Sequence, residues 1–166
     1  MLDKCGEMSR DDKAVLELSS FQLMGNWCEP YAVAITNVTP NHLNWHVDMR
    51  EYVSAKMGAV GTRTKRVVLN ADNDICASFD FGEREYIYFS STKGRYDDIV
   101  GTKNASAIFY RDGKVIFSSG DKESEILSLD DIKLPGRHNL ENYMTAIALT
   151  FGEVDFDIYR EVARTF

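Results

Sequence analysis

The chain has 166 residues, of which 44% are hydrophobic and 27% are charged, and its formal net charge is -7 at pH 7. This balance is typical of one globular domain. The negative charge argues against a nucleic-acid or anionic-membrane surface, because both require clustered Lys and Arg. No apolar run approaches the roughly 20 residues of a transmembrane helix, and we expect no secretory signal in the polar residues 1–13. The three cysteines form no CxxC pair, so we expect a reduced, cytoplasmic setting.

The first part of the chain alternates short apolar runs with a helical pattern. Ala14–Leu18 and Tyr31–Thr36 are predicted to be buried strands. Asp48 begins a predicted helix, because Glu51 follows it three residues later in a capping-box-like pattern. Gly61 is the predicted end of that helix.

The predicted elements of residues 66–118 are mainly strand-like runs. Arg66–Leu69 is a third predicted buried strand, Asn70–Asp72 is the turn after it, and Tyr86–Phe89 is strand-like. Asp112–Gly113 is a strong hairpin signal between two more strand-like runs. Those runs are Ala107–Arg111 and Lys114–Ser118. We therefore expect a small antiparallel piece attached to the main sheet.

Two helices are predicted near the end of the chain. Leu134–Gly136 breaks the chain before the first, which has apolar residues at i, i+3, i+4 and i+7. These residues are Leu140, Tyr143, Met144 and Ile147. The second, capped by Asp155 or Asp157, carries an apolar side made of Ile158, Tyr159, Val162, Ala163 and Phe166. The pattern predicts an α/β fold of mononucleotide-binding type, a largely parallel sheet flanked by helices with a small antiparallel flap.

Two polar stretches follow predicted strands, where ligands gather in open α/β sheets. Glu17 sits at such a strand end and is a natural Mg²⁺ ligand, because Mg²⁺ prefers hard oxygen donors. The alternative is that Glu17 caps the next helix. In the second stretch, His42 and His46 are four residues apart and could share a helical face as metal ligands. The alternative there is a polar loop with surface histidines.

Lys56 and two asparagines are further candidates. Lys56 lies among small residues of its helix, where a buried amine would have a lowered pKa and be nucleophilic. The alternative is a lysine whose amine reaches solvent. Asn139 and Asn142 are three residues apart at a helix start, and paired amides can read a purine edge. Helix capping by Asn139 is the alternative. The 166 residues contain no GxxxxGK(S/T) motif, so we see no triphosphate-binding loop.

In their order and spacing, these stretches resemble the Mur ligases from about Val15 to about Ala163. Residues 15–23 (VLELSSFQL) are most similar to the members that add D-glutamate to UDP-N-acetylmuramoyl-L-alanine. Residues 35–43 (ITNVTPNHL) resemble the metal-binding loop of the family, and residues 52–56 (YVSAK) resemble the helix that bears its carbamylated lysine. Residues 136–142 (GRHNLEN) resemble its adenine-side motif.

The resemblance implies an ATP- and Mg²⁺-dependent ligase of peptidoglycan synthesis that forms an amide through an acyl phosphate. Glu17 and His42 would then ligate Mg²⁺, and Lys56, as a carbamate, would help to hold a second Mg²⁺. His42 and Lys56 are the expected catalytic groups, and Asn139 and Asn142 would lie toward the adenine. The substrates would be a UDP-linked muramoyl compound and D-glutamate.

The sequence departs from the family at several positions. Asn41 and Asn44 replace the usual aspartates beside His42, and Trp45 replaces an arginine. Two fewer negative charges beside a metal site should weaken cation binding. We expect residues 1–166 to be a partial central domain that lacks the phosphate-binding loop and the N- and C-terminal domains, and to be inactive alone. The alternatives are another ligase of the Mur or folylpolyglutamate type and a non-catalytic binding module with the same fold.

Overall fold

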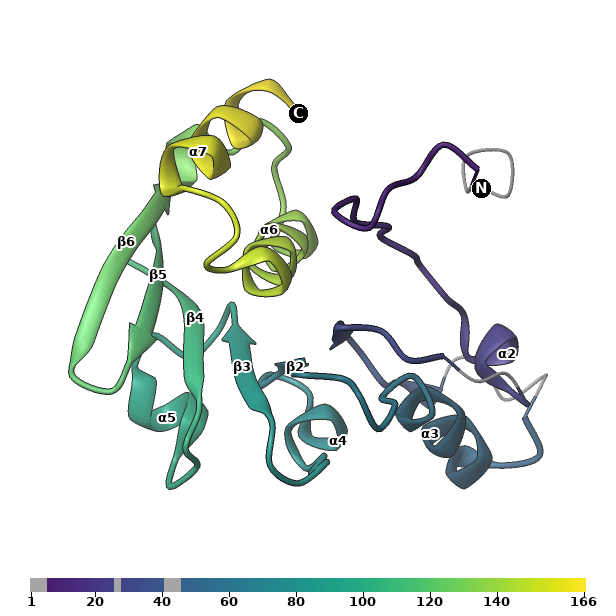
Figure 1. The fold of residues 1–166 in the computed structure, drawn as a ribbon. Coiled ribbons are helices and arrows are strands. Elements are labelled where there is room, and N and C mark those ends of the chain that lie inside the picture. Colours follow the sequence, from purple (N-terminus) through teal and green to yellow (C-terminus); the bar gives the residue numbers. More distant parts are fainter. Residues whose placement is uncertain (1–5, 26–27, 41–45) are drawn as a thin grey trace.

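A computed structural model describes residues 6–25, 28–40 and 46–166 (Figure 1). It contains a six-stranded sheet in the order β1-β2-β3-β4-β5-β6. The strands are β1 (Ala32–Ile35), β2 (Arg66–Asn70), β3 (Glu85–Ser90), β4 (Ser106–Arg111), β5 (Lys114–Ser119) and β6 (Lys122–Ser128). Neighbours from β1 to β4 pair in parallel, and β4, β5 and β6 pair antiparallel. The predicted α/β fold with a largely parallel sheet is confirmed.

Helices cover both faces of the sheet. They are α2 (Ser20–Leu23), α3 (Met49–Met57), α4 (Asp74–Ala77), α5 (Tyr96–Val100), α6 (Arg137–Thr150) and α7 (Phe156–Thr165), with a 3₁₀ turn η2 (Leu129–Asp131). Helices α3, α4 and α5 pack on one face, and α6 and α7 pack on the other.

Strand β2 shows why the sheet could be predicted. All five of its residues are buried. Val67 and Leu69 face the core under α3, α4 and α5, whereas Val68 faces the core under α6. Successive side chains of a strand point to opposite faces, so a strand covered on both sides reads as a continuous apolar run.

The antiparallel edge begins at the predicted hairpin. Asp112 and Gly113 have φ angles of 49° and 79°, the positive values that a tight two-residue turn requires. Strand β6 was not predicted, because its first four residues, 122–125, are polar and exposed. Its buried Ile126 and Leu127 pack on the α6 side of the sheet.

The structure contradicts the predicted strand Ala14–Leu18. This segment has no secondary structure, and Val15 is 84% exposed. A buried strand needs a paired neighbour and covered faces, and the described residues supply neither here.

Helix α3 begins as predicted but ends earlier. Asp48 is its N-cap and accepts hydrogen bonds from the backbone N–H groups of Arg50 and Glu51. Gly58, rather than Gly61, is the C-cap. Gly61 instead lies so close to other backbone that a Cβ would approach Cys28 O to 2.6 Å.

The two C-terminal helices are confirmed. Of the residues predicted to face the core from α6, Leu140, Met144 and Ile147 are buried and Tyr143 is partly buried. Asp155 is at the N-cap position of α7, although its side chain makes no capping bond. The apolar side predicted for α7 is confirmed only in part, since Ala163 and Tyr159 pack inward while the three remaining residues are exposed. Those three are Ile158, Val162 and Phe166.

Candidate functional site

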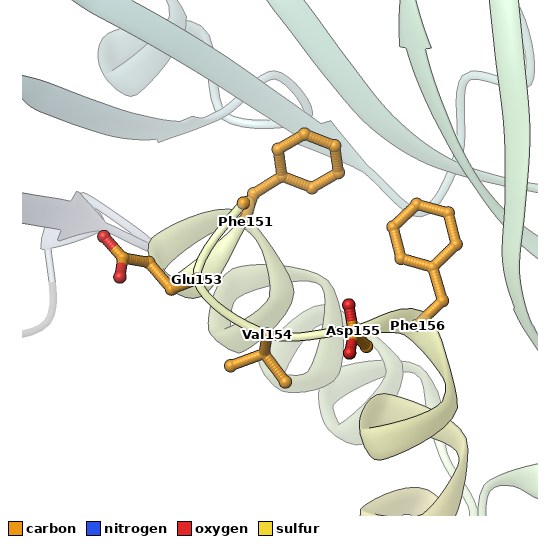
Figure 2. A pocket seen from close by; sticks show the side chains of 6 residues that line it. Phe151, Glu153, Val154, Asp155 and Phe156 are labelled. Carbon is orange, nitrogen blue, oxygen red and sulfur yellow. The ribbon is translucent and has the colours of Figure 1, made fainter.

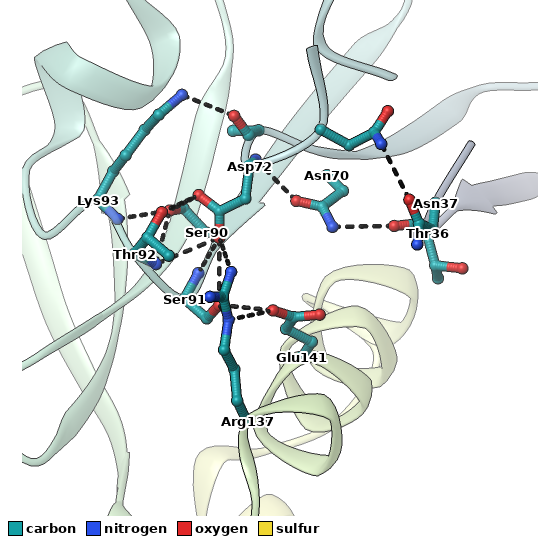
Figure 3. A network of polar contacts seen from close by, with 12 residues as sticks. Thr36, Asn37, Asn70, Asp72, Ser90, Ser91, Thr92, Lys93, Arg137 and Glu141 are labelled. Atoms are coloured by element: carbon teal, nitrogen blue, oxygen red, sulfur yellow. Dashed lines mark hydrogen bonds and ion pairs between the residues drawn. The ribbon is translucent and has the colours of Figure 1, made fainter. Parts of the chain in front are cut away.

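The parallel strands β1, β2 and β3 end at one edge of the sheet, and polar side chains follow each of them (Figure 3). Two asparagines connect the first two strand ends. Asn70 Nδ2 donates to Thr36 O at 2.9 Å, and Asn73 Nδ2 donates to Asn37 Oδ1 at 2.9 Å. This carboxyl edge is where open α/β sheets bind ligands.

Asp72, two residues after β2, organises the turn that follows β3. Its carboxylate accepts hydrogen bonds from the hydroxyls of Ser90 and Thr92 and from Ser91 N at 2.8 Å. Burial alone would raise the pKa of this carboxyl group, but the hydrogen bonds from the serines and the threonine outweigh it, so the pKa lies below its usual value. Asp72 is therefore a fixed negative charge at the carboxyl edge.

The first turn of α6 is tied to this edge. Arg137 Nε donates to Ser91 Oγ at 2.8 Å and to Glu141 Oε1 at 2.9 Å. Ser91 Oγ lies 2.6 Å from Glu141 Oε1 and 3.1 Å from Asp72 Oδ2. A hydroxyl has one proton, and the shorter distance favours donation to Glu141. Arg137 also lies 3.6 Å from Asp72 in an ion pair. We call Asp72, Ser91, Arg137 and Glu141 the edge network; Figure 3 shows it.

A pocket with a volume of about 640 Å³ brings together two of the predicted site residues. Glu17 and Lys56 both line it, although they come from different elements. Its other lining residues are Leu18, Ser19, Ser20, Phe21, Gln22, His46 and Tyr52. We call this the α2–α3 pocket.

Glu17 is exposed and lies just before α2. It does not cap this helix, because Ser19 is the N-cap and forms a capping box with Gln22. Among the described residues, no hydrogen bond or ion pair occupies the Glu17 carboxylate. The helix-capping alternative is therefore wrong, and the carboxylate is available to a ligand in the pocket.

Lys56 is half-buried in α3. Burial lowers the pKa of its amine, and the nearby Cys76 opposes that shift only partly. The Nζ atom lies 5.4 Å from the ring centroid of Tyr52. An amine that is easier to deprotonate reacts more readily as a nucleophile.

His46 is buried rather than exposed, so the surface-histidine alternative fails for this residue. Its Nε2 lies 2.9 Å from Ser20 Oγ, and its Nδ1 lies 3.6 Å from Glu51 Oε2 without a hydrogen bond. His46 thus joins α2 to α3. His42, the predicted ligand, lies outside the described residues, as do Asn41, Asn44 and Trp45. Among the residues that the structure describes, no group of three His, Cys, Asp or Glu side chains is arranged to hold a metal.

Asn139 and Asn142 lie in the first two turns of α6. Gly136 is the N-cap of this helix, so the alternative that Asn139 caps it is wrong. Asn139 Nδ2 donates instead to Pro135 O at 2.8 Å, and Asn142 is exposed. Both amides lie on the helix end that Arg137 ties to the carboxyl edge.

A smaller pocket of about 390 Å³ lies in the turn between α6 and α7 (Figure 2). Its lining residues are Phe151, Gly152, Glu153, Val154, Asp155 and Phe156. Arg66, the first residue of β2, bonds the carbonyls at the end of α6 just before this turn. The pocket therefore lies at the amino edge of the sheet, away from the edge where ligands are expected.

Sequence reasoning missed the edge network. The available signal was the carboxylate two residues after the most buried strand, followed about 20 residues later by a Ser-Ser-Thr run at the end of the next strand. None of the described helices combines the length and the apolar character that crossing a membrane would need.

Three comparisons relate the chain to known proteins. The model of the family described as Mur ligase middle domain matches residues 3–150. Two curated proteins named UDP-N-acetylmuramoylalanine--D-glutamate ligase are similar to this chain. The one from Acetivibrio thermocellus is 41% identical over 170 aligned positions, and the one from Ruminiclostridium cellulolyticum is 37% identical over 169. These alignments cover 100% of this chain but 34% of each relative, so the chain spans about a third of their length.

A solved structure shares the fold. It is a pseudomurein peptide ligase type C from Methanothermus fervidus, with a TM-score of 0.53 and 24% sequence identity. The likeness covers 82% of this chain and 34% of that chain. The family match over residues 3–150, on a sheet with the predicted architecture, shows that this chain belongs to the Mur ligase middle domain family.

Proposed function

We propose that the chain is the middle-domain part of an ATP-dependent ligase that joins D-glutamate to UDP-N-acetylmuramoyl-L-alanine. The observation that carries the proposal is the α2–α3 pocket, which places Glu17 and Lys56 together at one cavity. The similarity of residues 15–23 to the D-glutamate-adding members and the names of the relatives support this substrate choice. The reaction belongs to the full-length protein.

The proposed reaction forms an amide in two steps. The substrate carboxylate attacks the γ-phosphorus of ATP, giving an acyl phosphate and ADP. The amine of D-glutamate then attacks the acyl carbon, and inorganic phosphate leaves. Mg²⁺ ions supply charge stabilisation for the transferring phosphoryl group.

Two side chains of the pocket would supply oxygen donors to a divalent cation. Glu17 presents an exposed carboxylate, a hard oxygen donor. The lowered pKa of Lys56 increases the fraction of neutral amine, whose Nζ can form a bond to the carbon of CO₂ with loss of a proton. The resulting carbamate exchanges a positive charge for a negative one and would be a second oxygen donor. His42 would complete the ligands.

The first turns of α6 fit the adenine side of the nucleotide. Asn142 is exposed, and Asn139 uses one amide proton on Pro135 O. Their remaining donors and acceptors can pair with a purine edge. Both lie at the end of α6 beside the carboxyl edge, as a nucleotide site in this fold class requires.

Glu17→Gln in the full-length protein tests the proposal. We expect amide formation to fall by about 100-fold or more, because a cation ligand is lost, while the melting temperature stays unchanged, because Glu17 is exposed. Product is measured from the UDP-linked acceptor, D-glutamate, ATP and Mg²⁺.

Glu161→Gln is the matched control, since Glu161 is an exposed glutamate of α7 outside the pocket. It should leave the rate unchanged. A stable Glu17→Gln protein with wild-type activity contradicts the role of the pocket. A wild-type protein that binds ATP and forms no amide supports the binding-module alternative instead.

A further inference from the structure

We propose that the edge network is a positioning device that sets nucleotide affinity by holding the first turn of α6 against the carboxyl edge of the sheet. The proposal rests on the proposed function, because it concerns the turn that carries Asn139. The key residue of the edge network is Ser91, which connects the sheet to α6. Ser91 is a positioning residue, which acts on the nucleotide site only through Arg137 and Glu141.

The first turn of α6 has few other anchors. Gly136 gives it no side-chain cap, and Arg137 and His138 are exposed. Leu140 is the first residue of the helix to be buried in the core. The part of the turn before Leu140 is therefore held mainly by polar contacts, and those that reach the sheet pass through Arg137.

Asp72 makes the sheet side of the network rigid. Its side chain is 7% exposed and accepts hydrogen bonds from three successive residues, the last residue of β3 and the two that follow it. Charge-assisted bonds of this kind are stronger than neutral ones. The backbone of Ser91 is thereby fixed, and its hydroxyl has a defined position next to α6.

Ser91 connects this rigid turn to the helix. Its hydroxyl accepts from Arg137 Nε at 2.8 Å and lies 2.6 Å from Glu141 Oε1. Arg137 and Glu141 also pair with each other along α6 at 2.9 Å. Loss of the Ser91 hydroxyl would leave that helical pair intact while removing its main link to the sheet.

Ser91→Ala in the full-length protein tests the device. We expect the KM for ATP to rise by about tenfold, the effect of one hydrogen bond to charged groups, with kcat and the KM for D-glutamate within about twofold of wild type. Ser91→Thr keeps a hydroxyl and should restore the KM for ATP.

Ser78→Ala is the matched control, because it also removes a serine hydroxyl that makes a short hydrogen bond, here to Ile75 O at 2.7 Å, on the opposite face of the sheet. Ser78→Ala should leave kcat and the KM values for ATP and D-glutamate unchanged. An unchanged KM for ATP in Ser91→Ala overturns the proposal. So does a parallel rise in all substrate constants with a lower melting temperature, because that pattern indicates general destabilisation.

Titration with a non-hydrolysable ATP analogue separates this proposal from the proposed function. Weaker binding by Ser91→Ala than by wild type supports the edge network even if the full-length protein makes no amide. Equal binding overturns the edge network even if the amide is made. A wild-type protein that does not bind the analogue overturns both.

Discussion

At the scale of a single residue, the lowered pKa of Asp72 predicts how the stability of the fold depends on pH. Its folded-state pKa is lowered, so the carboxylate stabilises the fold above its unfolded pKa of about 3.9, and this contribution is lost as the pH falls through the folded pKa. Asp72→Asn removes the charge. We therefore expect the difference in unfolding free energy between wild type and Asp72→Asn to be constant above about pH 5 and to shrink below about pH 4.

Urea unfolding of the chain between pH 3 and pH 7 measures this difference. Asp121→Asn is a suitable control, because Asp121 is exposed in the turn between β5 and β6. Its unfolding free energy should follow that of wild type at every pH. A difference for Asp72→Asn that stays constant down to pH 3 would show that the hydrogen-bonded charge does not stabilise the native state.

Individual site residues differed in how far the sequence could reveal them. Glu17 and Lys56 stand in stretches with their own local signals, and the structure places both at one pocket. The edge network is marked only by polar residues at two strand ends, because Asp72, Ser91 and Arg137 are 19 and 46 residues apart and form no single motif. Only the parallel pairing of β2 with β3 and the packing of α6 bring them together.

At the scale of elements, Arg66 joins β2 to the end of α6. Its side chain is 8% exposed, and its guanidinium pairs with Glu85 at 2.9 Å and donates to the carbonyl oxygens of Ala148 and Leu149. Cations at a helix C-terminus satisfy carbonyls that lack partners in the helix. Arg66→Met keeps the apolar stem and removes these bonds, so we expect a loss of about 2–3 kcal/mol in unfolding free energy.

Equilibrium urea unfolding measures that loss as a lower midpoint at an unchanged slope. Lys114→Met provides the comparison, since Lys114 pairs with Glu125 at 2.6 Å and both side chains are about half exposed, at 50% and 46%. Exposed pairs contribute at most about 1 kcal/mol. Equal losses in the two variants would contradict the role assigned to the Arg66 guanidinium.

Helices and strands could be predicted from the sequence where their buried residues follow a regular spacing along the chain. Strand β2 is apolar because both of its faces are covered, and α6 repeats its buried residues at helical spacing. Helices α4 and α5 span four and five residues, too few for a period to appear. The run Ala14–Leu18 shows the opposite error, because apolar composition predicted a strand where the structure has an exposed segment without secondary structure.

Across the whole molecule, α6 is fastened at both edges of the sheet. Arg137 ties its start to Asp72 at the carboxyl edge, and Arg66 ties its end to the amino edge. The helix that carries the proposed adenine-side amides is thus held to the sheet at both of its ends. The α2–α3 pocket, with Glu17 and Lys56, lies on the side of the sheet covered by α3.

The 166-residue chain by itself should not hydrolyse ATP. A phosphate-binding loop supplies backbone N–H groups and a lysine to the phosphates of ATP, and the GxxxxGK(S/T) motif does not occur in this sequence. Without those donors the transferring phosphoryl group is neither positioned nor neutralised. We therefore expect the purified chain to release no phosphate from ATP in Mg²⁺ above the level of its Glu17→Ala variant. Release above that level would show that these residues build a phosphate site of their own.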